Sequence, residues 1–204
     1  YISGHPLDDY KTEINTYTNA NVSFFNDLPS YVNRELAFAG VVSEVQHRIS
    51  KNGKGWAAFT VEDYADSYEF RIFGEDYLKY RHFLIVNSFI FCKALVKEGW
   101  TNKETGKQGE PRLQYNGFYM LQEILESFTK KLTLKLRVDH LEEAQISGIK
   151  EIIQSHPGDL PLHFSLYEME ESIKVDFVSR SQKIGVNTAL LEALEAADVH
   201  FSLN

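Results

Sequence analysis

The sequence has almost no cysteine, no long apolar run and no excess of positive charge. Its 204 residues include one cysteine, Cys92, which excludes an internal disulfide framework and every multi-cysteine zinc pattern. No apolar run approaches the roughly 20 residues of a membrane-spanning helix, so no membrane partner is expected. The chain begins at Tyr1 without a methionine or a basic-then-apolar leader, and we expect a piece of a longer, soluble, cytoplasmic protein.

Catalytic signatures are missing as well. Gly53-Lys54-Gly55 lacks the strand-to-helix setting in which a glycine-rich loop binds phosphate, and the seven histidines never pair at the three- or four-residue spacing of a zinc-binding helix. Carboxylate pairs such as Glu62-Asp63 are better explained as solvated turns than as a two-metal site. We therefore expect no catalytic residue, no metal and no cofactor in this chain.

The net charge of −8 is unevenly distributed along the chain. Residues 34–123 hold 12 basic and 12 acidic side chains, whereas residues 1–33 carry a net charge of −3 and residues 124–204 a net charge of −5. This balance disfavours binding of a polyanion over the whole surface. Any anion site must therefore depend on a local cluster of basic residues.

The middle of the chain has the sequence pattern of a small β-barrel. Apolar and polar residues alternate over three segments, with an offset near Val45 that indicates a β-bulge. Strands are expected at 36–45, 59–62, 68–72 and 86–96, a strand or a strand plus a helical turn at 113–125, and a helix at 74–84. Three strands, a helix and two strands is the order of the five-stranded OB-fold barrel, which binds oligonucleotides on its second and third strands and adjoining loops. An SH3-like barrel is the competing interpretation. We expect an entry segment and linker at 1–33 and the OB-fold domain at 34–125.

Residues 126–204 predict a second domain, a small α+β sandwich with the order β-α-β-β-α-β. Its first strand, 132–138, alternates leucines with Lys131, Lys135 and Arg137, which gives it one buried and one basic face. The apolar stripe of the first helix is expected at Leu141, Ala144, Gly148 and Ile152. Further strands are expected at 160–166, 173–178 and 199–203, and a second helix at 188–197. The acidic charge of this domain favours a protein partner.

The strongest functional candidate is the segment 46–56, expected to join the first two strands. It brings together Arg48, Lys51 and Lys54, with Trp56 at the start of the second strand. Single-stranded nucleic acids need cations along their phosphates and flat aromatic faces for their bases, and this segment supplies both. If Phe70 and Ile72 are core residues, Arg71 points outward beside it. The loop near Trp100 and Lys103 supplies a further wall. The alternative is a glycine-rich hairpin whose lysines only maintain solubility.

The sequence also resembles a known family in an ordered set of short motifs. The segment Ile2–Tyr10 is similar to the Ser-Gly-His-Pro-Leu-Asp segment that precedes the OB domain in bacterial DNA polymerase III alpha subunits. In the same order, 39–42, 51–63 and 69–80 resemble its first strand, its basic loop with the second strand, and its third strand with the following helix. His156-Pro157-Gly158 is similar to a motif near its C-terminus.

This resemblance implies what the longer protein does. The parent chain is then a template-directed DNA polymerase, a nucleotidyltransferase of DNA replication whose metal-binding aspartates lie outside this chain. The OB domain would contact single-stranded template DNA, with Arg48, Lys51 and Lys54 matching the basic loop, and the terminal domain would dock the tau subunit of the clamp loader. Two alternatives stay open: a protein-interaction adaptor that binds no DNA, and an anticodon-binding OB module of a tRNA synthetase.

Overall fold

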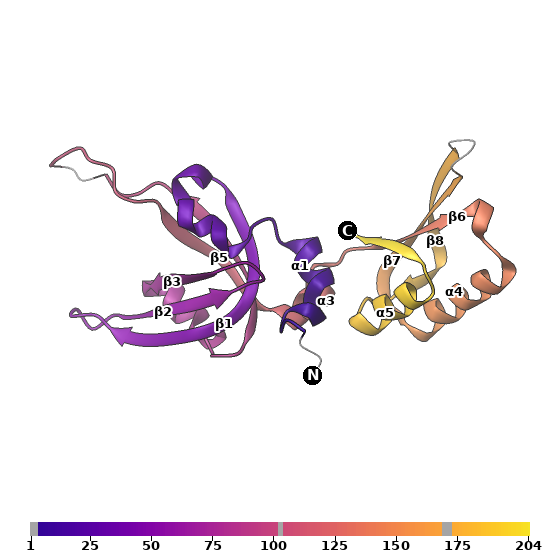
Figure 1. Cartoon of the computed structure of the whole chain (residues 1–204), viewed down its shortest axis with the longest axis horizontal. Coiled ribbons are helices and arrows are strands. Elements are labelled where there is room, and N and C mark those ends of the chain that lie inside the picture. Colours follow the sequence, from indigo (N-terminus) through magenta and orange to yellow (C-terminus); the bar gives the residue numbers. More distant parts are fainter. Residues whose placement is uncertain (1–3, 102–103, 169–172) are drawn as a thin grey trace. The chain divides into compact units, whose positions relative to one another are not determined.

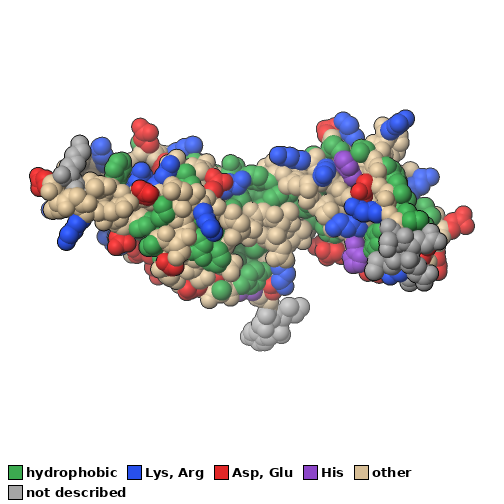
Figure 2. Space-filling model, turned by 90° about the horizontal axis from the view of Figure 1, so that it is seen from above, with side chains coloured by type: hydrophobic (Ala, Val, Ile, Leu, Met, Phe, Trp, Pro, Cys, Tyr) green, Lys and Arg blue, Asp and Glu red, His purple; other side chains and the backbone are tan. Residues whose placement is uncertain are grey.

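The computed structural model describes residues 4–101, 104–168 and 173–204. The chain divides into two compact units, Tyr1–Ile124 and Leu125–Asn204, which we call unit 1 and unit 2 (Figure 1). No helix in the described part of the chain is long and apolar enough to cross a membrane. Acidic and basic side chains are interspersed over the face shown in Figure 2.

Unit 1 is built on one antiparallel sheet with the strand order β3-β2-β1-β4-β5. Its strands are β1 (Glu35–Ile49), β2 (Gly55–Glu62), β3 (Ser67–Phe73), β4 (Phe89–Lys97) and β5 (Arg112–Met120). Its helices are α1 (Lys11–Tyr17) and α2 (Gly74–Tyr80), with 3-10 segments at Asp8–Tyr10, Val22–Tyr31, Arg81–Phe83 and Leu121–Glu123. The predicted order of three strands, a helix and two strands is confirmed.

The long strand β1 pairs with two neighbours in succession. Its residues 35–41 pair with β4 and its residues 41–49 pair with β2, and the register shifts between Val42 and Glu44. This irregularity is the predicted bulge, which bends the strand so that its two halves serve different neighbours. The structure also corrects the predicted end of this strand: it continues to Ile49 rather than ending near Val45.

A cluster of aromatic rings fills the core of unit 1. Phe38 and Phe70 stack with centroids 4.9 Å apart, and Phe25 meets both rings edge-on. Phe59 stacks on Phe70 at 5.4 Å, and all four rings are buried. Phe70 and Ile72 are thus core residues, which is the condition under which Arg71 was expected to point outward. Cys92 is also buried, and burial raises the pKa of its thiol well above the usual value, as expected for a core cysteine.

The predicted five-stranded OB-fold barrel is not confirmed, because strand pairing in the described residues does not close the sheet. The ladder ends at β3 on one edge and at β5 on the other. A side chain links the two edges instead: the hydroxyl of Tyr115 on β5 donates to the carbonyl oxygen of Arg71 on β3 over 3.1 Å. Tyr115 is buried, so this contact satisfies a hydroxyl that would otherwise be costly to bury.

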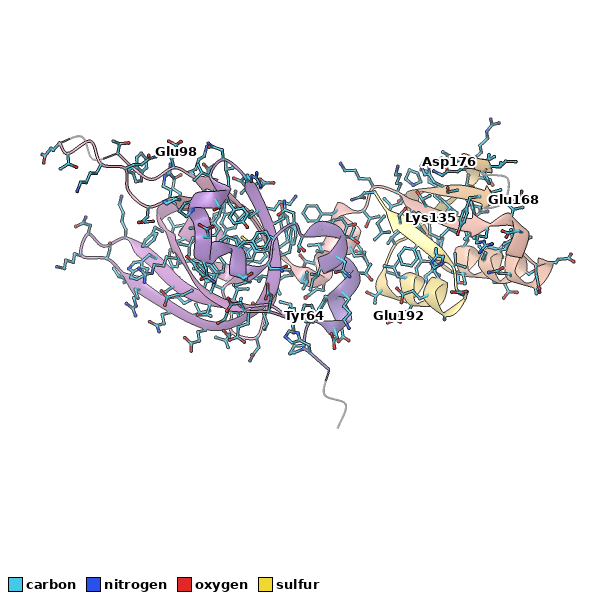
Figure 3. All side chains as sticks on the ribbon, turned by 45° about the horizontal axis from the view of Figure 1, so that its top comes forward. Tyr64, Glu98, Lys135, Glu168, Asp176 and Glu192 are labelled. Carbon is cyan, nitrogen blue, oxygen red and sulfur yellow. The ribbon has the colours of Figure 1, made fainter. Side chains whose placement is uncertain are left out.

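The segment that precedes the sheet is fixed to the turn between β2 and β3. The ring of His5 packs on that of Tyr64 with centroids 4.4 Å apart, and the Tyr64 hydroxyl donates to Asp8 over 3.3 Å. Lys11 pairs with the same carboxylate at 3.0 Å. Partial burial and the nearby Asp8 raise the pKa of Tyr64 to about 12. Tyr64 is labelled in Figure 3, far from the loop that begins near Glu98.

Unit 2 contains a four-stranded sheet with the order β8-β7-β6-β9 and two longer helices. Its elements are α3 (Ile124–Phe128, which begins at the last residue of unit 1), β6 (Leu132–Arg137), a 3-10 segment (Val138–His140), α4 (Glu143–Ser155), β7 (Pro157–Glu168), β8 (Ile173–Ile184), α5 (Thr188–Ala196) and β9 (His200–Leu203). From β6 to β9 the order is the predicted β-α-β-β-α-β. β6 and β7 are parallel and the other pairs are antiparallel.

The buried stripe of α4 differs from the predicted one. Ile149 and Ile153 are the buried residues of this helix, whereas Ala144 is exposed and Gly148 and Ile152 are half-buried. Both stripes have helical spacing, and the one with larger side chains is buried because it removes more apolar area from water. Val138, the last residue of the predicted strand 132–138, lies beyond β6 and is exposed.

Candidate nucleic-acid interface

The candidate residues Arg48 and Trp56 lie on paired strands and not on a flexible loop. The β1–β2 ladder continues through the pairs Arg48–Trp56 and Ile49–Gly55, so the connecting turn is only residues 50–54. Two backbone bonds close this turn, from Ser50 N to the Lys54 carbonyl at 2.8 Å and from Gly53 N to the Ser50 carbonyl at 2.9 Å. The sheet therefore holds Arg48 and Trp56 in a fixed relation to each other.

Glycine is required at two positions, one within this turn and one directly after it, for different reasons. Gly53 has a φ of +74°, a left-handed conformation that favours glycine. A Cβ on Gly55 would lie 2.5 Å from the ring of Tyr77 on α2, so only glycine allows this close approach. The turn projects Lys51 and Lys54 into solvent, where both side chains are exposed.

A row of three side chains crosses the outer face of the sheet beside the turn. Arg48 on β1, Trp56 on β2 and Phe73 on β3 are neighbours in register. The Arg48 guanidinium carbon lies 5.3 Å from the centroid of the Trp56 ring, and the Trp56 and Phe73 rings stack with centroids 5.3 Å apart. A cation and two aromatic rings thus form a continuous platform, which we call the aromatic row.

Phe73 was not among the residues predicted from the sequence. In the structure, its side chain is 56% exposed. It follows Arg71 by two residues, and residues two apart on a strand face the same side. The outward orientation that was inferred for Arg71 therefore also predicts an outward orientation for Phe73.

The next rows on the same face change from basic to acidic. Gln46, Ala58 and Arg71 form the second row by register. Arg71 is exposed and its Nη2 lies 2.9 Å from Glu69, so part of its charge is already neutralised. In the third row, Thr60 lies between Glu44 and Glu69. Among the described residues, the cations of this face that do not pair with a carboxylate are consequently concentrated at the end that carries the turn, where Arg48 donates to Gln46.

The loop between β4 and β5 projects from the same end of unit 1 as the β1–β2 turn (Figure 1). Its stem is held by a bridge between Thr101 and Gln108 and by a bond of 3.0 Å from Gly109 N to the Trp100 carbonyl. Trp100 is exposed, and the guanidinium carbon of Arg112 lies 4.5 Å from its ring centroid. The remaining candidate, Lys103, lies outside the described residues.

The side chains of this face can contribute aromatic stacking and positive charge. Within the described ranges, no group of three or more His, Cys, Asp or Glu side chains is arranged to hold a metal ion. The aromatic row places the exposed ring of Phe73 and the half-buried ring of Trp56 next to three cations, and aromatic rings beside cations are the groups with which proteins bind single-stranded nucleic acids.

Comparison with known proteins connects the chain to one family. Residues 132–204 match the sequence model of the family described as "DNA polymerase III alpha subunit, C-terminal domain". The DNA polymerase III subunit alpha of Borreliella burgdorferi is 33% identical over 180 residues, which cover 86% of this chain and 15% of that protein. The subunit alpha of Thermus aquaticus is 28% identical over 168 residues, which cover 80% of this chain and 13% of that protein.

Among solved structures, a putative aspartyl-tRNA synthetase from Leishmania major aligns with a TM-score of 0.34 and 14% identity, covering 59% of this chain and 22% of that one. The curated relatives are much longer than this chain, which spans about 15% of the length of the Borreliella protein. Their sequence similarity nevertheless extends over both units. The chain belongs to the family of DNA polymerase III alpha subunits, and its residues 132–204 match the C-terminal domain of that family.

Proposed function

We propose that unit 1 is an OB-type module of a replicative DNA polymerase and that it binds single-stranded template DNA on the outer face of β1, β2 and β3. The aromatic row carries this proposal, because it joins stacking surfaces to cations at the end of the sheet where the turn and the long loop project. Arg48, Lys51 and Lys54 would contact phosphates, while Trp56 and Phe73 would stack on bases. The polymerase activity itself is proposed for the longer parent protein.

The third row of the face, which we call the acidic row, limits the length of DNA that this face can hold. Glu44 and Glu69 flank Thr60, so a strand that followed the face away from the turn would meet like charge. With three principal phosphate contacts, the logarithm of the binding constant should fall against the logarithm of salt concentration with a slope of about −2. The affinity should be roughly micromolar or weaker at physiological salt.

Fluorescence anisotropy with a labelled oligodeoxythymidine of about 16 nucleotides tests this proposal. The triple variant Arg48→Glu, Lys51→Glu, Lys54→Glu should lose binding. A matched control, Lys150→Glu, Arg180→Glu, Lys183→Glu, makes the same change in net charge on exposed residues of unit 2 and should retain it. Equal affinity of the triple variant and the unaltered chain would exclude the turn as the DNA site. Preference for folded tRNA over the oligonucleotide would favour the tRNA synthetase interpretation.

We further propose that unit 2 docks a protein of the replisome, for which the family resemblance suggests the clamp-loader tau subunit. A row of exposed apolar side chains on β8, Ile173, Val175 and Phe177, supports this role, because soluble proteins seldom leave such a stripe uncovered. The excess of acidic residues in unit 2 disfavours nucleic acid there. Immobilised chain should retain purified tau subunit at micromolar concentration, and absence of retention would refute the docking role.

A further inference from the structure

Helices cover one face of the unit 2 sheet, and the side chains of that face become more exposed toward β8. Leu134 on β6, Phe164 on β7 and Phe177 on β8 form one row by register. Leu134 is fully buried, Phe164 is half-buried and Phe177 is 44% exposed. The next row repeats this gradient and ends at Val175, which is 52% exposed. The apolar surface of the sheet therefore extends further than the helices that cover it.

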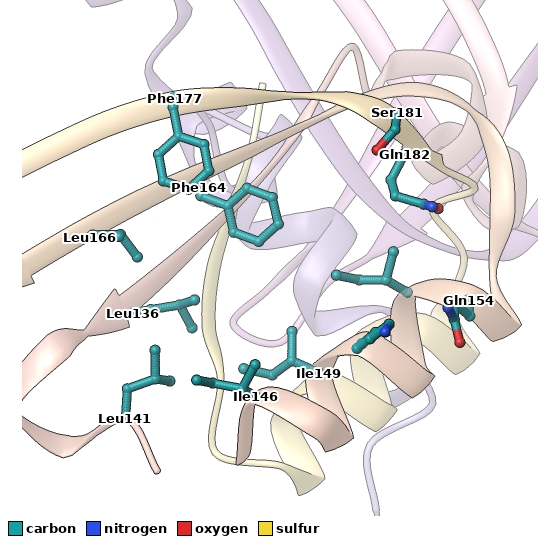
Figure 4. Close-up of a pocket in the computed structure, with 12 residues that line it drawn as sticks. Leu136, Leu141, Ile146, Ile149, Gln154, Phe164, Leu166, Phe177, Ser181 and Gln182 are labelled. Carbon is teal, nitrogen blue, oxygen red and sulfur yellow. The ribbon is translucent and has the colours of Figure 1, made fainter. Parts of the chain in front are cut away.

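A groove of about 460 Å³ lies where this cover ends. Figure 4 shows Phe164 and Phe177 on the sheet side and Ile146 and Ile149 on α4, turned toward a common open space. The two phenylalanine rings stack with centroids 5.1 Å apart, and Ile146 is 50% exposed across from them. Both walls of the groove thus present apolar side chains to solvent.

The polar residues of the groove are few and unevenly placed. Ser181, Gln182 and Gln154 lie together at one end, away from Leu141 at the other (Figure 4). Lys150 is the one charged side chain that lines the groove within the described residues. An occupant that matches this lining is apolar along one side and carries a carboxylate that can reach Lys150.

The width of the exposed apolar surface indicates which kind of secondary structure can occupy the groove. Neighbouring strands lie about 4.8 Å apart, so the exposed parts of β7 and β8 together span about 10 Å. A helix with its side chains is about 10 to 12 Å across, so one further helix fits beside α4. A strand added to the free edge of β8 would extend the sheet and leave the groove empty.

We propose that the groove binds an amphipathic helix of another protein, with apolar residues at helical spacing and an acidic residue opposite Lys150. This inference rests on the proposed docking role of unit 2 and names its site and the chemistry of its partner. The helix would lie on Phe164, Phe177 and Ile146, in the manner of a third helix of the same layer. Binding of this helix would bury the apolar side chains that are exposed at the β8 end of the sheet.

A displayed library of random 16-residue peptides, about the length of four to five helical turns, is the probe. It is selected on the whole chain and then screened against the double variant Ile146→Glu, Phe177→Glu. Both positions are half-exposed, so the variant should fold, which circular dichroism verifies. Leu78→Glu, Ile85→Glu places the same charges on exposed apolar residues of unit 1 and serves as the control.

Selected peptides should carry apolar residues at i, i+3 or i+4, and i+7 with a nearby acid. Their binding should weaken roughly ten-fold or more on the groove variant and stay unchanged on the control. Lys150→Glu should weaken them too, and replacing the acid of the peptide by lysine should restore binding to that variant.

Three results would overturn the proposal: no selected binder, binders that the groove variant keeps, or peptides with strict alternation that pair with the edge of β8. The docking role is tested separately by retention of the tau subunit. If the chain retains tau and the groove variant also retains it, docking stands and the site assigned to it is wrong. If the chain does not retain tau, the docking role itself fails.

Discussion

Phe73 should contribute more to DNA binding than Trp56, although Trp56 is the larger ring. The Arg48 guanidinium already lies over the Trp56 ring, and a base that replaced it would have to displace a contact worth about 0.5 to 1 kcal/mol. Phe73 has no such competitor among its described contacts and is 56% exposed. A base stacked on an aromatic ring is worth about 1 to 3 kcal/mol. Since Trp56 already covers part of Phe73, the lower half of that range applies.

Phe73→Ala should therefore weaken binding of oligodeoxythymidine about 5- to 30-fold, which corresponds to about 1 to 2 kcal/mol. Trp56→Ala should weaken it less, because the substitution also removes the cation–π contact that holds Arg48 over this ring. The salt dependence should be unchanged in both variants, because no phosphate contact is removed. Anisotropy titrations at several salt concentrations measure both quantities.

An abasic oligonucleotide of the same length separates stacking from a structural effect. It offers phosphates without bases, so Phe73→Ala should bind it as tightly as the unaltered chain does. An equal loss on the abasic and the thymidine strands would show that the substitution disturbs the turn and its cations. No loss on either strand would refute the assignment of Phe73 as a stacking surface.

Two further predictions concern individual carboxylates. Glu69→Ala should release Arg71 from its ion pair and raise DNA affinity a few-fold at low salt, with Glu192→Ala on α5 as the control; an equal gain in both variants would point to net charge alone. Glu13 is buried, and burial raises the pKa of its carboxyl, so its ionisation destabilises the folded state above the pKa of the unfolded chain. Glu13→Gln should therefore raise the melting temperature at pH 7 and lose this advantage below about pH 4, and a pH-independent shift would contradict this cause.

The alternation of apolar and polar residues was sufficient to predict most strands. Phe70 and Ile72 face the core, because a half-buried strand fixes the side on which each residue lies. The end of β1 was not predictable in this way. Residues 46–49 have a largely polar composition, and they are held as a strand by pairing with β2 and not by burial of their own side chains.

The helix α4 shows where sequence periodicity alone is ambiguous. Ala144, Gly148 and Ile152 have the same spacing as Ile149 and Ile153, and both sets satisfy a helical apolar stripe. The choice depends on which side chains fill the space above the sheet, a property of tertiary packing. The groove could not be predicted from the sequence for the same reason. The exposure of Phe177 depends on how much of the sheet α4 covers, which is also a property of tertiary packing.

The charge balance of unit 1 decides how it can assist a polymerase. Unit 1 holds 13 basic and 16 acidic residues, an acidic excess that cannot attract DNA from a distance, so only strands delivered close to the turn should bind. There the three cations would act over about one Debye length, roughly 8 Å at physiological salt, and the two rings would hold one or two bases. Glu44 and Glu69, on either side of Thr60, would stop the strand from spreading across the sheet. Such a surface would guide template that another part of the protein already holds, and it would release each nucleotide readily as the strand moves.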